Sequence, residues 1–389
     1  MSPVDEVFEK YNKSHPDAYH AACFTAIDKT GKVLYSNNNG NSKVDGSGAP
    51  VTEDSIFWTA SMTKIFTATA AMIVVERGLI GLDDDVGAVV SDLADPDILV
   101  GFEDEKPILL KAKGKLTLRN LLTHSSGFSY KFTNPDLMKW GTYMGQTDVI
   151  GASFDAFRQP LIFEPGEDWA YGPGVDWAGK VVEVLSRKTL DEFIQGNICD
   201  RLGLTATTFH PEKHPEYAER KVELAMRGED GKFSATPLPF PMPAVDDLGG
   251  SGIYSTPREF TKLLATLLAG GGNVLKSESV DQIFMPQIKD NKALMAKFTA
   301  GPPRMGRLLT SGKTIHQGLS VCINLEQVPN GRCPGSVSWG GHANTFWFID
   351  PKAGVCATMF FQMLPPVDET AIQILDDVEA ALYKEIGPV

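Results

Sequence analysis

The sequence predicts an α+β fold in which both ends of the chain build one antiparallel sheet. Runs with alternating apolar side chains lie at residues 20–36 and beyond about residue 306, and the segment between them has mainly helical and irregular patterns. Strands from distant parts of a chain bury their apolar faces by pairing in a single sheet. We therefore expect a discontinuous sheet domain of residues 1–85 and 306–389, flanked by helices. Residues 86–305 are expected to form a mostly helical domain with irregular loops over a cleft.

The first part of the chain predicts a helix, a hairpin and a short strand. Residues 4–14 have the pattern of a short helix. The runs 22–27 and 33–35 alternate on either side of a polar turn at 28–32, which is the signature of a β-hairpin. A loop rich in Gly, Asn and Ser follows, and residues 56–58 then predict a short strand.

The stretch after this strand predicts a buried helix with a candidate nucleophile at its start. Residues 65–75 are almost entirely apolar, and Gly78 is a natural helix stop. Ser61 and Lys64 are three residues apart and therefore lie on one face of a helical turn. Burial disfavours the charged form of an amine, and a neutral lysine can accept the serine proton. Ser-x-x-Lys also occurs by chance in most chains of this length, so the pair needs further motifs to support it.

The middle of the chain contains a candidate base and two phenols. Residues 115–130 predict a short helix and then a turn that includes His124. His124 has the chemistry of a catalytic base, but we favour a structural role in the turn because Lys64 already supplies a base. Tyr130 is either a core residue or a phenol at the cleft. Tyr171 lies on a tight loop before a helix over 175–185, where a phenolate beside a lysine can shuttle protons.

The remaining elements are predicted from breakers and from a change of period. Residues 210–245 are polar and proline-rich and predict an irregular lid or connector. A glycine turn then precedes an amphipathic helix over 258–268. Near the C-terminus we expect the following strands and a final helix: residues 319–325, 337–342, 345–350 and 355–362, then a helix over 368–386.

Composition limits the partners and the compartment. The chain has 389 residues, 42% of them apolar, and a net charge of 36 − 49 = −13 without basic runs, which argues against nucleic acid and anionic membranes as partners. The first residues lack the basic start and apolar core of a signal peptide, and no apolar run is long enough to span a bilayer. We therefore expect a cytoplasmic protein. Its five cysteines are far apart in the sequence and read as free thiols in a reducing compartment.

A metal site is not expected. His210 and His214 have the spacing of two ligands on a helix, but Pro211 and Pro215 interrupt that helix. The acidic run 83–85 is typical of a solvated helix start, because no further ligands follow it.

Three motifs in order connect the chain to a known superfamily: Ser61-Met62-Thr63-Lys64, Tyr171-Gly172-Pro173 and Trp339-Gly340-Gly341-His342. Together they resemble the class C β-lactamase and penicillin-binding-protein superfamily. Within it, the chain is most similar to the branch of serine esterases and fungal acyltransferases of the lovastatin side-chain transferase type. The supporting stretches cover most of the chain, so their order is far more specific than any single motif.

The resemblance implies a role for each motif residue. Ser61 is expected to be the acylated nucleophile, Lys64 the base that activates it, and Tyr171 the group that relays the proton to the leaving group. The N–H groups of Ser61 and His342 are expected to form the oxyanion hole. The strand at Gly340-Gly341 is expected to line the cleft, where bare glycines admit the substrate; an edge bulge explains the same glycines.

Two positions depart from the β-lactamase pattern. Pro173 stands where these enzymes usually have Asn, and Trp339 stands where they have the Lys of Lys-Thr-Gly. The cleft therefore lacks an amide and a cation that bind lactams, and an apolar acyl group fits it better. Trp339, Tyr130 and Phe361 are candidates for the wall of that pocket, although each is also a common core residue.

The resemblance therefore implies a serine enzyme that takes an acyl group from an ester or thioester. It would pass this group to water or to an alcohol of a small molecule. The donor is a small molecule or an acyl-carrier-bound thioester, and no metal or organic cofactor is implied. The alternatives are a weak β-lactamase or D-Ala-D-Ala-type peptidase, and a non-catalytic ligand-binding relative. The last is disfavoured because Ser61, Lys64 and Tyr171 are all present.

Overall fold

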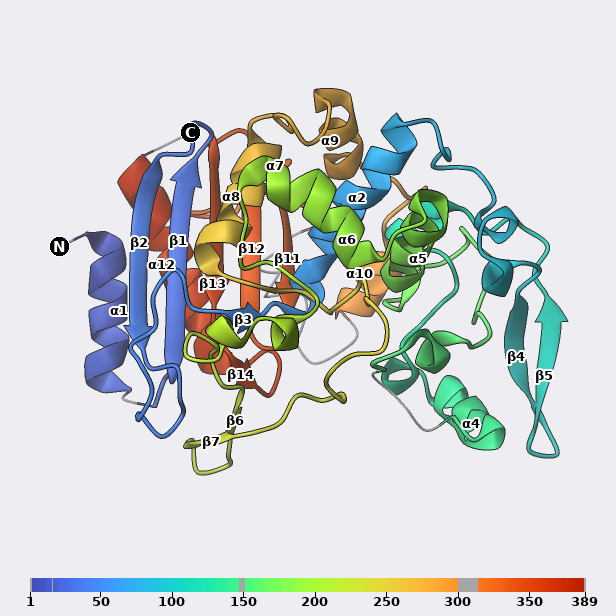
Figure 1. The fold of residues 1–389 in the computed structure, drawn as a ribbon, viewed down its shortest axis with the longest axis horizontal. Helices are drawn as coiled ribbons and strands as arrows, with labels where there is room; N and C mark the ends of the chain where they lie inside the picture. The colour runs from blue at the N-terminus through green and yellow to red at the C-terminus, as the bar shows by residue number, and fades with distance from the viewer. Residues whose placement is uncertain (1, 16, 147–150, 300–313, 388–389) are drawn as a thin grey trace.

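The computed structural model describes residues 2–15, 17–146, 151–299 and 314–387 (Figure 1). Its main feature is a seven-stranded sheet in the order β2-β1-β13-β12-β11-β10-β9. The strands are β1 (Ala21–Asp28), β2 (Val33–Gly40), β9 (Ile315–Gln317), β10 (Cys322–Asn324), β11 (Val337–Gly341), β12 (Thr345–Asp350) and β13 (Val355–Phe360).

Pairing of β1 with β13 joins the two ends of the chain. All strand pairs in this sheet are antiparallel, and Thr25 lies opposite Thr358 in the β1–β13 register. Both strands are buried along almost their whole length. The predicted α+β fold with a sheet drawn from both termini is therefore confirmed. The predicted domain border near residue 306 lies outside the described residues, and the division into two domains stays a prediction.

Helices cover both faces of the sheet. The terminal helices α1 (Pro3–Ser14) and α12 (Glu369–Ile386) pack together on one face, and α8 (Pro257–Leu268) packs on the other against β1 and β13 (Figure 1). The hydroxyls of Thr261 and Thr358 are 2.8 Å apart across this second contact. One face of the sheet is therefore covered by a helix that comes from the middle of the chain.

Helix α2 (Lys64–Glu76) lies between the sheet and the helical part of the molecule (Figure 1). Every side chain from Lys64 to Val74 is buried. A short 3-10 turn, η1 (Ala60–Thr63), precedes α2, and Gly78 follows its end with a φ of +68°. The predicted buried helix and its glycine stop are therefore present, and Ser61 lies in the 3-10 turn rather than in the α-helix itself.

Between its loops, the middle of the chain has mainly helices as regular structure, with two exceptions. Besides α8, these helices are α3 (Leu118–Leu122), α4 (Pro135–Met144), α5 (Gly174–Ser186), α6 (Leu190–Ile194), α7 (Asp200–Leu202), α9 (Ser277–Phe284) and α10 (Lys292–Thr299). The exceptions are the hairpin β4 (Asp97–Glu103) and β5 (Lys106–Lys111), and a small sheet of β6 (Ala225–Arg227), β7 (Phe233–Ala235) and β14 (Met363–Leu364). A further pair joins β3 (Phe57–Trp58) to β8 (Tyr254–Ser255).

The hairpin β4–β5 is an element that the sequence analysis did not predict. Its two turn residues, Asp104 and Glu105, both have positive φ values, of 45° and 64°. Tight hairpins need such a conformation and usually obtain it with Asn-Gly or Asp-Gly, so Asp-Glu gives little signal. The outer strand is exposed along almost all its length, and burial therefore left no alternating pattern to detect.

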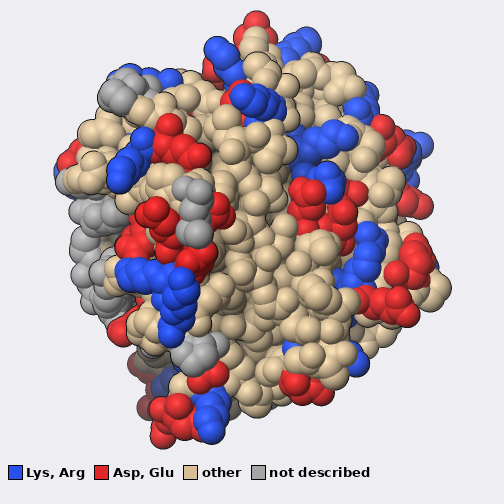
Figure 2. All heavy atoms as spheres, turned by 90° about the vertical axis from the view of Figure 1, so that its left-hand side faces the viewer, with Lys and Arg blue, Asp and Glu red and all other residues tan. Residues whose placement is uncertain are grey.

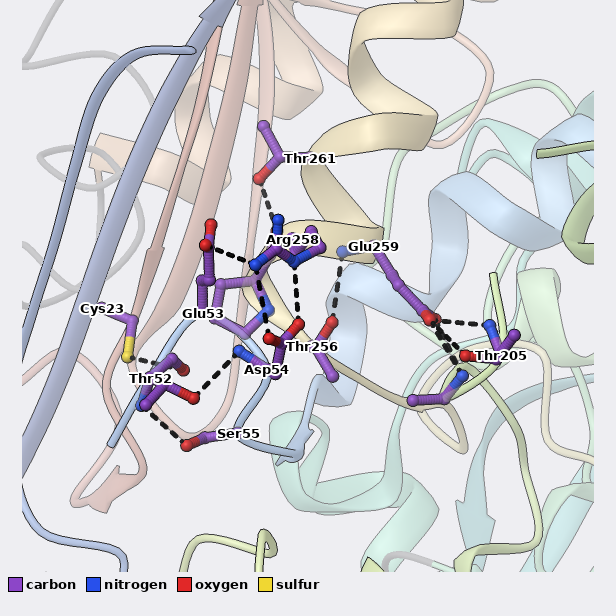
Figure 3. Close-up of polar contacts among 12 residues, drawn as sticks. Cys23, Thr52, Glu53, Asp54, Ser55, Thr205, Thr256, Arg258, Glu259 and Thr261 are labelled. Carbon is purple, nitrogen blue, oxygen red and sulfur yellow. Dashed lines mark hydrogen bonds and ion pairs between the residues drawn. The ribbon is translucent and has the colours of Figure 1, made fainter. Parts of the chain in front are cut away.

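Polar contacts at the start of α8 hold the segment that leads to Ser61 (Figure 3). Arg258 Nε donates to Asp54 at 2.8 Å, just before β3. The neighbouring Glu259 carboxylate is buried and accepts the N–H groups of Thr205 and Ala206 at 2.7 and 3.0 Å, and the Thr207 hydroxyl at 2.7 Å. Helix α8 therefore holds two loops in place, the one before β3 and the one that contains Thr205.

The composition predicted a surface without basic runs and five free thiols. On the face in Figure 2, which is the left side of Figure 1, basic and acidic side chains are intermixed around an uncharged band. All five cysteines are buried free thiols, as predicted. Every helix in the described part of the chain is too short or too polar to cross a bilayer.

Candidate active site

Ser61 lies in a tight turn between β3 and α2. The residue before it, Ala60, is buried and has a φ of +47°. Alanine rarely adopts this left-handed conformation, which costs about 1–3 kcal/mol, and such residues concentrate at functional sites. The Ser61 N–H lies in the first turn of η1, where amide groups have no partner within the helix. The turn therefore presents both the hydroxyl and the N–H of Ser61.

Two side chains hold the Ser61 hydroxyl. Lys64 Nζ donates to Ser61 Oγ at 3.2 Å, and the Tyr171 hydroxyl donates to the same oxygen at 2.7 Å. The Lys64 side chain is 0% exposed, and its Nζ lies 4.9 Å from the centre of the Tyr171 ring. The structure therefore brings together the three residues that the sequence analysis selected.

A buried carboxylate holds the glycine turn behind Lys64. The Gly250 carbonyl accepts a hydrogen bond from Lys64 Nζ at 2.8 Å, and the Gly250 N–H donates to Asp176 Oδ1 at 2.8 Å. A Cβ at Gly250 would lie 2.3 Å from Asp176 Oδ2, so the turn requires glycine. Burial raises the pKa of Asp176 to about 6, and the nearby Lys64 charge opposes this shift. Asp176 therefore positions the amine through a single residue, Gly250.

We expect Asp176→Asn to change how stability depends on pH. The folded-state pKa, about 6, lies above the ordinary 3.8, so the native state binds this proton more tightly than the unfolded chain does. The ionised carboxylate therefore costs stability as pH rises from about 4 to about 6. Asparagine keeps the acceptor for Gly250 but does not ionise. The melting temperatures of the variant and the wild type are measured from pH 4 to pH 7. The difference, variant minus wild type, should increase as pH rises from about 4 to about 6. Parallel curves for the two proteins would contradict this role of Asp176.

The loop that carries Tyr171 is held by the turn at residues 124–130. The Tyr130 N–H donates to the Tyr171 carbonyl at 3.1 Å, and the Ala170 N–H donates to the His124 carbonyl at 2.9 Å. A Cβ at Gly172 would lie 2.4 Å from the Phe128 carbonyl oxygen, so the close approach of the two loops depends on this glycine. Backbone contacts between the two loops therefore fix the position of the Tyr171 phenol.

His124 and Trp339 form the packing behind Tyr171. The His124 ring stacks on Trp339 with centroids 5.7 Å apart and meets the Tyr171 ring at 4.9 Å. Burial and the nearby Lys64 hold the pKa of His124 well below its usual value, so the ring is neutral. Among the described residues, no hydrogen bond joins His124 to Ser61. This position agrees with the structural role predicted for His124.

The end of β11 lies directly against the Ser61 turn. A Cβ at Gly341 would lie 2.4 Å from the Thr59 carbonyl oxygen, and the Thr345 hydroxyl donates to that oxygen at 3.2 Å. His342 follows, with its ring 6.3 Å from that of Trp58. The bareness of Gly341 is therefore explained by packing against the nucleophile turn. The close approach also places the predicted oxyanion-hole residues, Ser61 and His342, on adjoining segments.

The predicted pocket residues have different positions. Tyr130 packs edge-on against Tyr171, with centroids 5.2 Å apart, and its pKa is raised well above the usual range by burial and by Asp176. Trp339 is only 2% exposed and supports Tyr171, so it offers little surface to a substrate. Phe361 is 0% exposed and contacts Tyr19 at 5.9 Å, in the core. Its assignment to the pocket is a correction: the strand alternation that turns Phe360 toward α8 turns Phe361 to the opposite face.

The sequence analysis missed Asp176 and Ala60. A signal for Asp176 was present, because it is the one charged residue among the first six residues of this helix. A charge within a buried face usually has a partner or a function. Ala60 gave no signal, since an alanine side chain does not favour the left-handed backbone that this residue adopts.

The chain is similar to known proteins in sequence and in structure. The sequence model of the family described as Beta-lactamase matches residues 5–381. A lovastatin esterase from Penicillium rubens is 33% identical over 367 residues, which cover 90% of each chain. A monacolin J acid methylbutanoyltransferase from Aspergillus terreus is 33% identical over 348 residues, which cover 86% of this chain and 84% of that protein. An unliganded simvastatin synthase structure from Aspergillus terreus has a TM-score of 0.88 at 32% identity and covers 99% of each chain.

Proposed function

The chain belongs to the beta-lactamase family, and from this premise we propose that it works through an acyl-enzyme formed on Ser61. The observation that carries the proposal is the position of Ser61 Oγ, which accepts hydrogen bonds from both Lys64 Nζ and the Tyr171 hydroxyl. A serine held by a base and a second proton carrier is the arrangement that activates a nucleophile. The enzyme class is serine esterase or acyltransferase, as its relatives' names indicate.

In the first half-reaction, Ser61 Oγ attacks the acyl carbonyl. Lys64, with Tyr171, accepts the hydroxyl proton as the new C–O bond forms. The N–H groups of Ser61 and His342 stabilise the negative oxygen, whose charge appears only in the transition state. Tyr171 then donates a proton to the leaving alcohol or thiol, which departs and leaves the acyl group on Ser61.

In the second half-reaction, the acyl group passes from Ser61 to a hydroxyl group. Lys64 and Tyr171 remove a proton from the incoming water or alcohol, and Ser61 Oγ is the leaving group that takes a proton back. The relatives are named for lovastatin and for a methylbutanoyl group with monacolin J acid, both small molecules. We infer that this chain acts on a small-molecule ester or thioester, including an acyl-carrier-bound donor, and on an alcohol of similar kind.

We expect esters to be better substrates than lactam antibiotics. Pro173 lacks a side-chain amide, and Trp339 is buried against Tyr171 and is not a cation at the cleft. Each unpaired polar group of a bound lactam costs about 1–3 kcal/mol. Two such losses lower kcat/KM by about one to four decades. Short aliphatic esters need neither partner, so kcat/KM for p-nitrophenyl butyrate should exceed that for nitrocefin.

The measurement uses one enzyme preparation for both substrates, with Ser61→Ala as the blank. A higher kcat/KM for nitrocefin would restore the weak β-lactamase alternative. Addition of a bulky alcohol to the ester assay separates the two remaining functions. Formation of a new ester at the expense of free acid identifies an acyltransferase, and an unchanged yield of free acid identifies an esterase.

A further inference from the structure

A second cavity lies beside β3 and β8, away from the Ser61 hydroxyl. Its volume is about 760 Å³, within the range of sites for small molecules. Trp58, Val222 and Leu238 are among its apolar walls, and neither Ser61 nor Tyr171 lines it. Trp58 lies at the side of the cavity that is nearer to the predicted oxyanion hole, since its ring is 6.3 Å from that of His342.

Two buried polar side chains that line this cavity each have an atom without a hydrogen-bond partner among the described residues. Tyr254 and Gln362 are 1% and 2% exposed. The Tyr254 hydroxyl and the Gln362 Oε1 atom are closed to solvent and unpaired. Most buried polar atoms in proteins are paired, and an unpaired one costs about 1–3 kcal/mol. Two such atoms at one cavity indicate a site that a ligand completes.

The unpaired atoms define the chemistry of that ligand. Burial raises the pKa of Tyr254, so its hydroxyl is neutral and donates, whereas the amide oxygen of Gln362 only accepts. A hydroxyl group accepts from the first and donates to the second. The charged side chains that line the cavity balance, since Lys43 and Lys221 lie there with Glu219 and Glu223. An anionic or cationic ligand therefore gains nothing from these charges.

We propose that this cavity is a second small-molecule site, which takes an uncharged, hydroxyl-bearing compound with an apolar body. The body lies against Trp58 and Leu238, and the hydroxyl pairs with Tyr254 or Gln362. Neither polar atom reaches solvent in the free protein, so the ligand reaches them with a small rotation of these side chains. The hydrogen bonds that it restores favour this rotation. The site does not depend on acyl transfer at Ser61.

The test measures binding of 2-naphthol, an uncharged aromatic alcohol, to the full chain by calorimetry or by saturation-transfer NMR. Ser61→Ala is the background, so that turnover does not interfere. We expect saturable binding with a Kd below about 1 mM. Tyr254→Phe and Gln362→Met remove the unpaired atoms and keep the side-chain volume, and each should weaken binding about tenfold. Tyr254→Phe should not lower the melting temperature, because the lost hydroxyl has no partner.

Tyr217→Phe is the matched control. The Tyr217 hydroxyl lies in the same apolar cluster but donates to the Thr205 carbonyl at 2.5 Å. Its loss should lower the melting temperature and leave the Kd unchanged. Three results would overturn the proposal: no saturable binding of 2-naphthol, equal effects of Tyr254→Phe and Tyr217→Phe on the Kd, or a weaker Kd after Tyr171→Phe. The last result would place the probe at the catalytic centre.

Discussion

Ser61→Ala is expected to abolish acylation of the protein and to reduce ester turnover to the uncatalysed background. The Ser61 hydroxyl is the atom held by Lys64 Nζ and the Tyr171 hydroxyl, and alanine leaves those two groups with nothing to activate. Loss of a nucleophile typically costs at least about 10⁴-fold in kcat. Intact-protein mass spectrometry after mixing with p-nitrophenyl butyrate shows the acyl adduct directly, and kcat is measured in parallel.

Ser129→Ala is the control, because Ser129 lies next to Tyr130, and among the described residues its hydroxyl bonds only the Thr133 hydroxyl, at 3.1 Å. It should acylate normally. Lys64→Met fills the same buried space without a base and should slow acylation by about 10²–10⁴-fold, the usual contribution of a general base. An acyl adduct on Ser61→Ala with full turnover would show that another residue is the nucleophile.

Tyr171→Phe is expected to lower turnover by about 10²-fold or more, with little change in melting temperature. The substitution keeps the ring and its contacts with His124, Tyr130 and Trp339. It removes only the hydroxyl that donates to Ser61 Oγ at 2.7 Å. The proton then has no route from the phenol to the leaving group. The measurement is kcat for an ester, together with the thermal unfolding curve of the same preparation.

Tyr383→Phe gives the opposite pattern and serves as the control. The Tyr383 hydroxyl is buried and donates to Asp350 at 2.6 Å, in the core between α12 and the sheet. Its loss leaves a buried carboxylate with one partner fewer, so the melting temperature should fall while turnover stays normal. If Tyr171→Phe instead destabilised the chain and left kcat intact, Tyr171 would be a core residue.

Local patterns were sufficient to predict most elements of the sheet. Residues 345–350 and 355–362 predicted a hairpin that the structure has as β12 and β13. Both strands are buried along their whole length, and continuous runs rich in apolar, β-branched and aromatic residues are typical of a strand that is covered on both faces. The strand predicted over 319–325 is shorter in the structure, and β9 beside it was not predicted. Strands of three residues are too short to show a period.

The sequence by itself determined the residues that meet at Ser61. The spacing of Ser61 and Lys64 is local, so helical geometry alone predicts their contact, and the resemblance to the superfamily implied that Tyr171 lies beside them. The orientation of a side chain relative to segments that are far away in the sequence depends on tertiary packing. Only the tertiary structure therefore decided that Phe361 faces the core and that Trp339 supports Tyr171.

The tertiary structure also decided how the reactive groups are held. Asp176 acts on Lys64 through Gly250, which is 74 positions away from Asp176 in the sequence, and a pattern in one segment does not report such a contact. Ala60 has a left-handed backbone where Gly341 of β11 lies against the Thr59 carbonyl, a contact between segments far apart in the sequence. The sequence specifies the chemistry of each side chain, whereas backbone strain and burial are properties of the packed molecule.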